Sequence, residues 1–382
     1  MSTTNLTVPS SSISETAVPL RTTASGSPIR FSVCIPNYNY ARYLSATIDS
    51  VLAQTYPHFE IIVADNASTD NSASVVESYN DPRIRLVRNR YNIGFAPNLD
   101  RATEPARFEF MLLLSSDDLM RPTALETYAN VLSTLSEDAE HVVLTSAIDV
   151  IDSNGNLVGV SYRKAGAMFY STTSPESAAI IDWERPSTEI NAGHAVLAQL
   201  LRAKQLPAMF LATCYSRKAY DTVQGYHNGY RMFPDGHFLC KLLSQNPSLV
   251  YVPQRLFAYR EHNSNQLSQE AASGALKYQI DAFMHTIEFP SEFLDRVGVS
   301  RQELIDVFVK KAVMERGLQS LAGGSWLRAL KCLAFAFATY PGAALLESKT
   351  YLLAALLALG PLGKLLARWI YAARKQILRG MK

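Results

Sequence analysis

The chain has 382 residues, enough for two or three domains or for one catalytic domain with substantial additions. A formal net charge of +2 argues against a general nucleic-acid-binding protein. The four cysteines are far apart and form no CxxC pair, which argues against a disulfide framework and fits a reducing cytoplasm.

Residues 1–28 are rich in serine and threonine, with Glu15 and Arg21 as the only charged side chains. The segment lacks the basic start and apolar run of a signal peptide, and its composition predicts a disordered tail. We expect ordered structure to begin at Ile29.

From Ile29 onward, short apolar runs alternate with segments of helical periodicity. The runs predict buried strands at residues 29–35, 59–64, 84–87, 108–114, 142–151 and 249–252. Between them, apolar residues at helical spacing, such as Leu44, Ile48 and Val51, predict helices that cover the sheet. The alternation predicts an α/β fold with a mostly parallel sheet flanked by helices.

Polar residues follow several of these strands, at the edge where open α/β sheets bind ligands. The first strand runs into Pro36 and Tyr38, the second into Asp65, and the third into a loop with Asn92 and Gly94. Glycine in that loop would allow close backbone approach to a ligand, with Asn92 as a polar contact.

The fourth strand ends in the sequence MLLLSSDDLMRP, residues 111–122. Adjacent carboxylates at a strand end repel one another unless a cation or buried donors neutralise them, and Mg²⁺ or Mn²⁺ beside a diphosphate suits such oxygen ligands. We therefore predict Asp117 as a metal ligand. The alternative is that Asp117 or Asp118 caps the next helix, with Pro122 in its first turn.

Neither a G-x-G-x-x-G after the first strand nor a P-loop occurs, so a dinucleotide fingerprint and a Walker NTPase are not supported. Three segments in order instead resemble the catalytic domain of family 2 glycosyltransferases: residues 31–72 (FSVCIPNYNYARYL and onward), 88–98 (RNRYNIGFAPN) and 113–122 (LLSSDDLMRP). These are inverting enzymes of GT-A fold that use nucleotide-sugar donors. The resemblance covers residues 29–262, with Ser115 where many members carry an aspartate.

The resemblance implies roles for the residues at the sheet edge. Tyr38 would flank the donor base, Asp65 would accept hydrogen bonds from base or ribose, and Ser116 would contact the ribose of the donor. The alternative, from the residues alone, is that Tyr38 is a half-buried ring that packs against its neighbours and that Asp65 is a turn or cap residue.

Residues 225–239 resemble the family segment in which a glycine-aromatic pair precedes an acidic residue that opens a helix. Asp235 falls on the position of the catalytic base, preceded by Pro234 where the family often has glutamate, and His237 follows. A first-turn carboxylate that stabilises the helix is the alternative. A relay between Asp235 and His237 is a weaker reading.

Residues 259–262 (YREH) resemble the closing Tyr-Arg-x-His pattern of the family. His262 would complete the metal shell or contact the diphosphate, and Arg260 would neutralise phosphate charge. A histidine in a loop is otherwise usually only solvated.

Beyond residue 265 the sequence becomes helical, with an apolar stripe that includes Trp326, Leu330 and Phe337, and a break at Pro341. Residues 351–359 are apolar but too short to cross a bilayer. Basic residues recur after Glu347 with Trp369 and Tyr371 among them, which suits an amphipathic helix on an anionic membrane. The alternative is a helical hairpin packed on the catalytic domain or in a homodimer.

Together these features predict a tail (1–28), a GT-A glycosyltransferase domain (29–265) and a helical, membrane-associating region (266–382). The expected activity is Mg²⁺- or Mn²⁺-dependent transfer from a UDP- or dTDP-sugar to a glycan or lipid-linked acceptor. It would occur at the cytoplasmic face of a bacterial plasma membrane, in surface polysaccharide assembly. A sugar-1-phosphate nucleotidyltransferase and an inactive GT-A scaffold remain alternatives.

Overall fold

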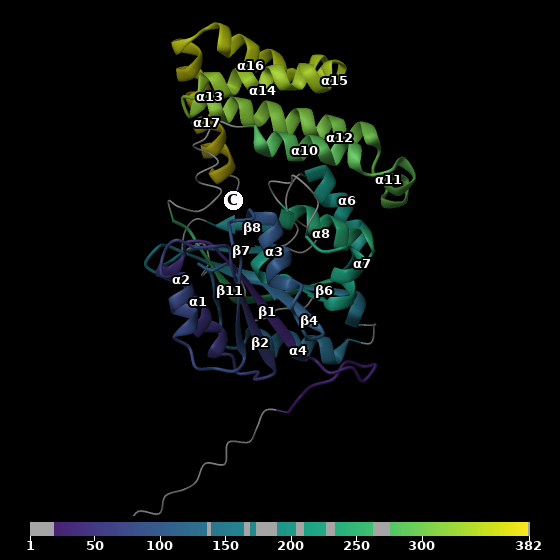
Figure 1. The fold of residues 1–382 in the computed structure, drawn as a ribbon. Coiled ribbons are helices and arrows are strands. Elements are labelled where there is room, and N and C mark those ends of the chain that lie inside the picture. The colour runs from purple at the N-terminus through teal and green to yellow at the C-terminus, as the bar shows by residue number, and fades with distance from the viewer. Residues whose placement is uncertain are drawn as a thin grey trace, which may run out of the picture.

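The computed structural model describes residues 19–135, 139–163, 169–172, 189–203, 210–226, 234–262 and 276–380. Among these residues, eleven strands form one sheet with helices on both faces, and a group of helices follows at the C-terminus (Figure 1). The predicted α/β fold with a mostly parallel central sheet is confirmed.

The main path of the sheet runs in the order β3-β2-β1-β4-β10-β6-β11-β5. The strands are β1 (Phe31–Asn37), β2 (Phe59–Asp65), β3 (Ile84–Arg88), β4 (Phe110–Leu113), β5 (Leu119–Met120), β6 (Val142–Ile151), β7 (Leu157–Arg163), β8 (Phe169–Thr172), β9 (Glu189–Ala192), β10 (Cys214–Ser216) and β11 (Ser248–Arg260). Strands β3, β2, β1 and β4 are mutually parallel, as are β6 and β11. The short β10 joins these two halves because it runs antiparallel to both β4 and β6.

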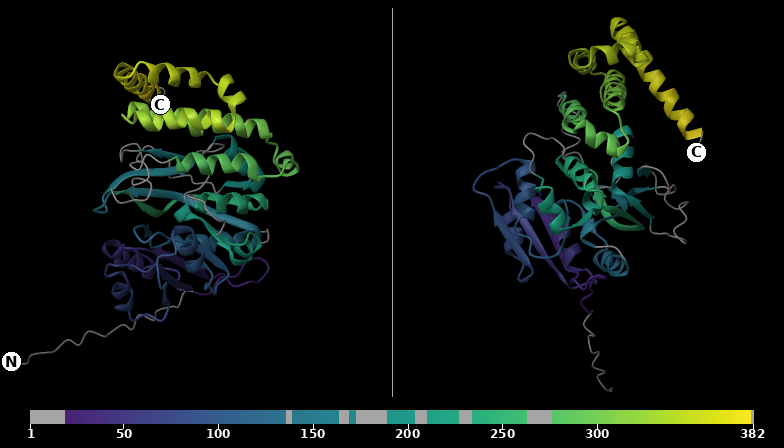
Figure 2. Two further views of the ribbon diagram at one scale, coloured as in Figure 1. Left: turned by 45° about the horizontal axis from the view of Figure 1, so that its top comes forward. Right: turned by 90° about the vertical axis from the view of Figure 1, so that its right-hand side faces the viewer.

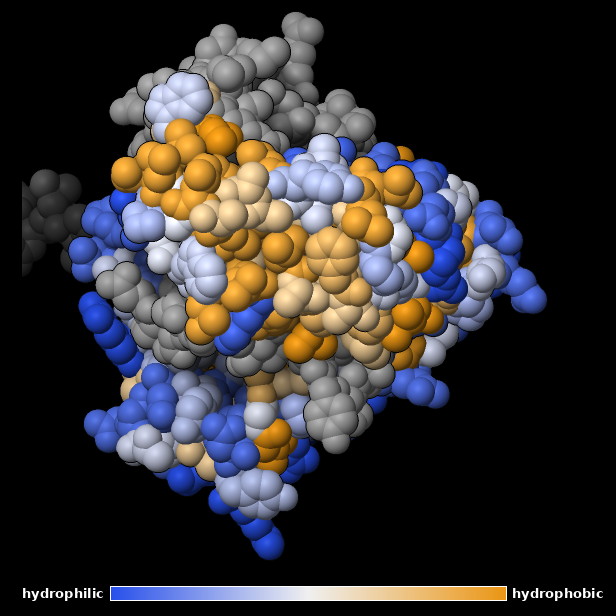
Figure 3. All heavy atoms as spheres, turned by 90° about the horizontal axis from the view of Figure 1, so that it is seen from above, coloured by the Kyte–Doolittle hydropathy of each residue, from blue (hydrophilic) through white to orange (hydrophobic). Residues whose placement is uncertain are grey.

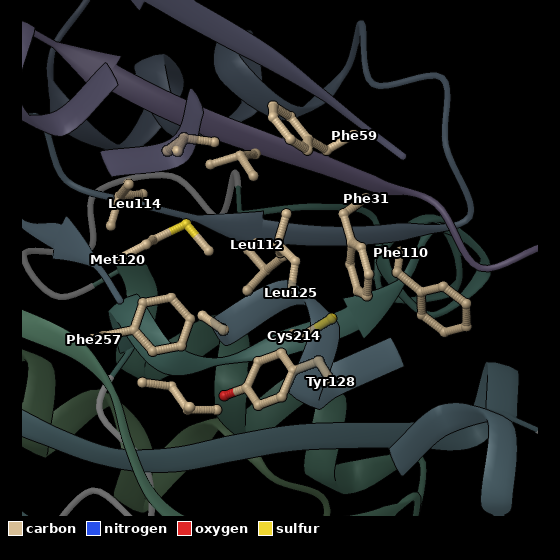
Figure 4. Packing of buried hydrophobic residues seen from close by; sticks show 14 of the residues in the cluster. Phe31, Phe59, Phe110, Leu112, Leu114, Met120, Leu125, Tyr128, Cys214 and Phe257 are labelled. Atoms are coloured by element: carbon tan, nitrogen blue, oxygen red, sulfur yellow. The ribbon is translucent and has the colours of Figure 1, made fainter. Parts of the chain in front are cut away.

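Alternation along the strands sends side chains to two cores. In β1, Val33 packs in the cluster beneath α1 (Ala41–Leu52), α2 (Ser72–Glu77) and α4 (Ala124–Thr134). Figure 4 shows that cluster around Leu112, Tyr128 and Phe257. The next residue, Cys34, packs on the opposite face. The helices there are α3 (Phe95–Thr103), α6 (Gly193–Ala203), α7 (Arg217–Thr222) and α8 (Pro234–Ser244).

Most of the C-terminal helices share a hydrophobic core of their own and form a separate layer (Figure 2), whereas Leu294, Val297 and Leu304 pack in the core on the α3 face of the sheet. The C-terminal helices are α10 (Lys277–Glu288), α11 (Ser291–Val297), α12 (Arg301–Val307), the π-helical η3 (Phe308–Glu315), α13 (Arg316–Ala322), α14 (Trp326–Thr339), α15 (Pro341–Leu346), α16 (Ser348–Ala358) and α17 (Pro361–Gly380). An ion pair between Arg202 Nε and Glu303 Oε1, at 3.2 Å, links α6 to α12. None of the helices in the described part of the chain is both long and apolar enough to cross a membrane.

One expectation at the N-terminus needs correction. Residues 1–18 of the predicted tail lie outside the described residues, but residues 19–28 are ordered. Thr22 forms a bridge with Pro28, and the backbone N–H of Arg21 donates to Tyr56 Oη at 3.2 Å. Low hydrophobicity did not prevent order here, because backbone hydrogen bonds hold this segment beside the sheet. The predicted boundary after residue 265 also lies outside the described residues.

Candidate active site

The carboxyl ends of the parallel strands meet at one edge of the sheet. Asn37, at the end of β1, pairs with Asp65 at the end of β2, and the Asp117 segment follows β4. Since β11 runs parallel to β6, and β6 has the direction of β4, Arg260 at the end of β11 reaches the same edge. Most of the residues predicted from separate motifs are thus neighbours at one sheet edge.

Asp117 and His262 are in direct contact, although 145 positions separate them in sequence. His262 Nε2 lies 2.9 Å from Asp117 Oδ2, and the Asp117 side chain is 11% exposed. Burial raises the pKa of Asp117 above its usual value, and the bond with His262 opposes this shift. The two predicted metal ligands are therefore brought together in a partly desolvated position.

Asp118 is held by β11. Its Oδ1 accepts from the backbone N–H of Arg260 at 2.8 Å. Burial, and then the negative charge of Asp117, raise the pKa of Asp118 well above its ordinary range. The alternative of helix capping is not observed for either aspartate, since α4 has Thr123 at its N-cap position and no side-chain capping bond.

The contact between Asp117 and His262 provides a test of the predicted cation. Asp117 Oδ2 and His262 Nε2 lie 2.9 Å apart, and a divalent cation held there would favour the charged form of the buried Asp117 carboxylate. The combination of a carboxylate oxygen and an imidazole nitrogen suits Mn²⁺ better than Mg²⁺. The residues present therefore fit the cation.

Arg260 holds both aspartates in place: its side chain binds the Asp117 backbone, and its backbone N–H binds the Asp118 side chain. Its Nε donates to the backbone carbonyl of Asp117 at 2.8 Å, and its Nη1 donates to that of Asp152 at 3.2 Å. The guanidinium lies 4.9 Å from the centroid of the Tyr43 ring. Arg260 is 5% exposed, so its positive charge is buried, and its hydrogen bond orients the Asp117 segment. Contact of Arg260 with phosphate remains a prediction.

Two tyrosines that the sequence reasoning left without a role flank His262. The ring centroids of Tyr40 and Tyr43 lie 5.7 and 5.0 Å from that of His262. Burial and the nearby Asp117 raise the pKa of Tyr40. Their spacing of three residues at the start of α1, which puts both rings on one side of the helix, was the available signal.

Tyr38 and Asp65 differ in what they contact. Tyr38, next after β1, is 41% exposed at the sheet edge. Asp65 is 3% exposed, and its Oδ1 accepts from Asn37 Nδ2 at 2.9 Å and from Ser68 Oγ at 2.5 Å. The turn role of Asp65 is thus present, while the donor roles of both residues remain predictions.

Asn92 and Ser116 are fixed by neighbouring segments. Asn92 Oδ1 accepts from Asn66 Nδ2 at 2.9 Å and from the backbone N–H of Gly94 at 2.8 Å. The backbone of Gly94 has φ 91°, a left-handed value that glycine adopts without strain. Ser116 is buried, and its carbonyl accepts from Thr47 Oγ1 at 3.0 Å. These bonds set the shape of the loops, and donor contact remains a prediction.

Asp235 lies in the first turn of α8, which precedes β11 in the chain. Because α8 ends close to the beginning of β11, the helix starts near the carboxyl edge of the sheet, on the α3 face. Burial raises the pKa of Asp235, and the negative charge of Asp281 on α10 adds to the shift. The strand and helix order thus brings Asp235 to the sheet edge that also carries Asp117.

The segment before α8 is anchored to α3. The backbone N–H of Tyr226 donates to Asp100 Oδ1 at 2.7 Å, and residues 227–233, which connect this anchor to α8, lie outside the described residues. His237 Nε2 lies 3.3 Å from Glu288 Oε1 on α10. This contact directs His237 toward the C-terminal helices and gives no support to a relay with Asp235.

A hollow of about 560 Å³ lies at the opposite, amino edge of the sheet, lined by residues that include Thr23, Glu109 and Arg217. None of the predicted site residues lines it. The hollow is therefore separate from the candidate active site.

The sequence model of the family described as Glycosyl transferase family 2 matches residues 32–176. This segment is a family 2 glycosyltransferase domain. The matched segment contains Tyr38, Asp65, Asn92, Ser116 and Asp117, whereas Asp235, Arg260 and His262 lie beyond it.

Two curated relatives of the family 2 domain come from bacteria. The UDP-Glc:alpha-D-GlcNAc-diphosphoundecaprenol beta-1,3-glucosyltransferase WfgD of Escherichia coli is 37% identical over 101 residues, which cover 26% of this chain and 40% of WfgD. The putative teichuronic acid biosynthesis glycosyltransferase TuaG of Bacillus subtilis is 37% identical over 97 residues, 25% of this chain and 38% of TuaG. The chain thus spans about two fifths of the length of these relatives.

Solved structures extend the likeness in fold beyond the family 2 domain. S. aureus TarS 1-349 superposes with a TM-score of 0.54 at 16% identity, covering 89% of both chains. The same TarS segment in complex with UDP-GlcNAc gives a TM-score of 0.53 at 18% identity. At these identities the comparison shows a shared GT-A-type fold.

Proposed function

We propose that the chain is a metal-dependent inverting glycosyltransferase that moves a sugar from a nucleotide-diphosphate donor to an acceptor hydroxyl. The observation that carries this proposal is the contact between Asp117 and His262 at the sheet edge where α8 also begins. This contact supports a cation site at that edge, and α8 would add a separate carboxylate from a different element, Asp235. Donor activation and acceptor deprotonation need these two kinds of group.

Asp117 Oδ2 and His262 Nε2 would hold the cation, Mn²⁺ or Mg²⁺. When bound, the ion supplies Lewis-acid neutralisation of charge on the leaving diphosphate. Arg260 keeps the Asp117 backbone in place from beneath, and Tyr40 and Tyr43 restrict the ring of His262. The chain thereby preorganises the ligands before the donor arrives.

Asp235 would accept the proton of the acceptor hydroxyl as that oxygen attacks the anomeric carbon. A raised pKa makes this carboxylate a stronger base than an exposed aspartate. One base and one displacement give inversion at the anomeric carbon. The second carboxylate of a retaining glycosidase is not needed, because the leaving group is already activated.

The donor is proposed to be a UDP- or dTDP-sugar. An exposed tyrosine ring at Tyr38 provides a stacking surface for a base, and Asp65 ends the neighbouring strand. The name of WfgD gives UDP-Glc as its donor, and TarS was solved with UDP-GlcNAc. Both names support a uridine nucleotide.

The acceptor is proposed to be a glycan or lipid-linked glycan in bacterial surface polysaccharide assembly. WfgD is named for a diphosphoundecaprenol-linked acceptor and TuaG for teichuronic acid biosynthesis. We further propose that residues 29–265 form the catalytic domain and residues 266–382 a helical domain that holds the enzyme at the inner face of the plasma membrane.

The surface of these helices supports the membrane proposal. Figure 3 shows a broad apolar area on this end of the molecule. Exposed large apolar side chains include Leu327, Leu345, Leu346, Tyr351, Leu365 and Trp369. Glu347 is the only acidic residue after Glu315 in the sequence, whereas basic residues recur. An apolar, cationic face matches an anionic lipid surface better than it matches a second copy of itself, because two such copies would repel.

The decisive experiment compares wild type with Asp235→Asn. Thermal shift with a panel of nucleotide sugars and Mn²⁺ first identifies the donor, since a ligand that binds only the folded state raises Tm. Asp235→Asn should keep that Tm shift and reduce transfer at least about 100-fold, the lower end of general-base contributions. Equal loss of binding and transfer would contradict the role of Asp235.

The same assay separates the alternatives. A nucleotidyltransferase would release pyrophosphate from a nucleoside triphosphate and a sugar phosphate. A scaffold would bind donor but neither hydrolyse nor transfer it in the presence of Mn²⁺. Either outcome would overturn the proposed reaction.

A further inference from the structure

We propose that His237, His285 and Glu288 form a second metal site, specific for an ion of the Zn²⁺ type, which ties α10 of the C-terminal helices to α8. This inference does not rest on the proposed transfer reaction. It concerns a cluster that shares no residue with the candidate active site.

The distances within the cluster fit a single ion. The three potential ligand atoms all lie within 4.8 Å of one another. His237 Nε2 and Glu288 Oε1 are 3.3 Å apart. In a tetrahedral zinc site with bonds of about 2.0–2.1 Å, two ligand atoms are separated by about 3.3–3.4 Å. One pair is therefore already at the spacing that zinc requires, and the remaining ligand needs only a small side-chain movement.

The elements place the three side chains face to face. His285 and Glu288 are three positions apart on α10, so they lie on one side of that helix. His237 comes from the facing helix α8, and its ring is stacked on that of His285 at a centroid distance of 6.3 Å. The His237 side chain is 2% exposed and that of Glu288 is 23% exposed. The cluster is thus at a packed interface and open to solvent at the glutamate.

The ligand set selects the type of ion. Two imidazoles and one carboxylate suit Zn²⁺, whereas Mg²⁺ prefers oxygen ligands. Three protein ligands leave a fourth position for water. Among the described residues this is the only group of three such side chains close enough to share an ion.

The place of this site suggests that a bound ion would hold the start of α8 in position. His237 follows Asp235 by two residues in the first turns of α8. A metal bridge from His237 to α10 would fix the start of α8 relative to the C-terminal helices. The competing explanation is an ion pair between protonated His237 and Glu288, which needs no metal.

The test uses tag-free, full-length protein, stripped with a chelator, reloaded with one equivalent of Zn²⁺ or Co²⁺ without nucleotide, and desalted. We expect about one Zn²⁺ per chain by mass spectrometry of the metal, and the visible absorption bands of tetrahedral Co²⁺. Zn²⁺ should also raise Tm. His262→Ala should keep all three signals, which separates this site from Asp117 and His262, and His58→Ala is a histidine control outside both sites.

His285→Ala and Glu288→Gln should each lose the bound ion and the Tm shift. If His285→Ala fails to fold, the Co²⁺ spectrum of wild type and the milder Glu288→Gln decide. No retained Zn²⁺ in wild type, or full retention in both variants, overturns the proposal and leaves the ion pair alone. Loss of the ion in His262→Ala but not in His285→Ala would assign the metal to the active site instead.

Discussion

At the scale of single residues, the contact between His262 and Asp117 makes a specific prediction about the cation. His262→Gln keeps a hydrogen-bonding group beside Asp117 but replaces an imidazole by a weak ligand. The Mn²⁺ concentration for half-maximal transfer should rise at least about tenfold, which corresponds to about 1.4 kcal/mol of lost binding. Titration of activity with Mn²⁺ measures this.

The matched control is His58→Gln, a histidine that stacks edge-on against Tyr56 and has no part in the site. It should leave the Mn²⁺ titration unchanged. A shift of the same size in both variants would mean that His262 acts through stability and not as a ligand.

At the scale of elements, the close packing of α3 against the segment that leads to α8 depends on Gly225. Its φ is 66°, and a Cβ there would lie 2.5 Å from Asp100 Oδ1 and 2.7 Å from Tyr220 Oη. Both atoms belong to a buried network, with Tyr220 Oη donating to Asp100 Oδ1 at 2.7 Å. Gly225→Ala should therefore destabilise the fold through both backbone strain and a clash.

Gly298→Ala is the comparison, because Gly298 has φ 71° and open space around its Cβ position. It should lower the free energy of unfolding by about 1 kcal/mol, the backbone term alone. Gly225→Ala should lose a further 1–3 kcal/mol, roughly the range for overpacking. Denaturant unfolding of both variants measures the difference, and equal losses would show that Asp100 and Tyr220 move aside.

The elements that were predictable from sequence are those with a strong local pattern. Strands β1, β2 and β6 were expected because each is a mostly apolar run, rich in β-branched residues, that leads into polar residues. The three-residue β10 and the two-residue β5 carry too few residues to show a period, and they exist because longer neighbours pair with them. Their antiparallel direction is likewise a property of the assembled sheet.

The functional residues likewise divide into those that the sequence indicates and those that only the folded structure brings together. Asp117 was selected because adjacent carboxylates follow a buried strand, and Asp235 and His262 were selected by resemblance to a family. The structure adds the contact of Asp117 with His262. The cluster of His237, His285 and Glu288 was missed because a spacing of three on one helix is common. His285 forms a cluster only with His237, which lies 48 positions earlier in the chain. No local sequence pattern indicates that these two residues are close in space.

At the scale of the whole molecule, the apolar face of the C-terminal helices predicts binding to anionic vesicles. Leu346 is 88% exposed and Trp369 is 70% exposed, so changing both to glutamate should leave the fold intact. Cosedimentation with phosphatidylglycerol vesicles should weaken at least about tenfold, since each buried large side chain contributes about 1.5–3 kcal/mol. Binding by wild type should also decrease with added salt.

Leu157→Glu, at an exposed leucine on β7, provides the control and should bind vesicles like wild type. Light scattering of the same proteins tests the homodimer. If wild type is a dimer that the double variant dissociates, and neither binds vesicles, the face is a subunit interface and the membrane proposal is wrong.

The attachment of Asp117 and Asp118 to the end of β11 limits how this protein can be shortened. A fragment that stopped at residue 176 would retain the whole matched family segment and still lack Arg260 and His262. Its two aspartates would have lost their neutralising neighbours and would take up protons or solvent. We therefore expect the smallest autonomous catalytic unit to extend through residue 262, well past residue 176, where the family match ends.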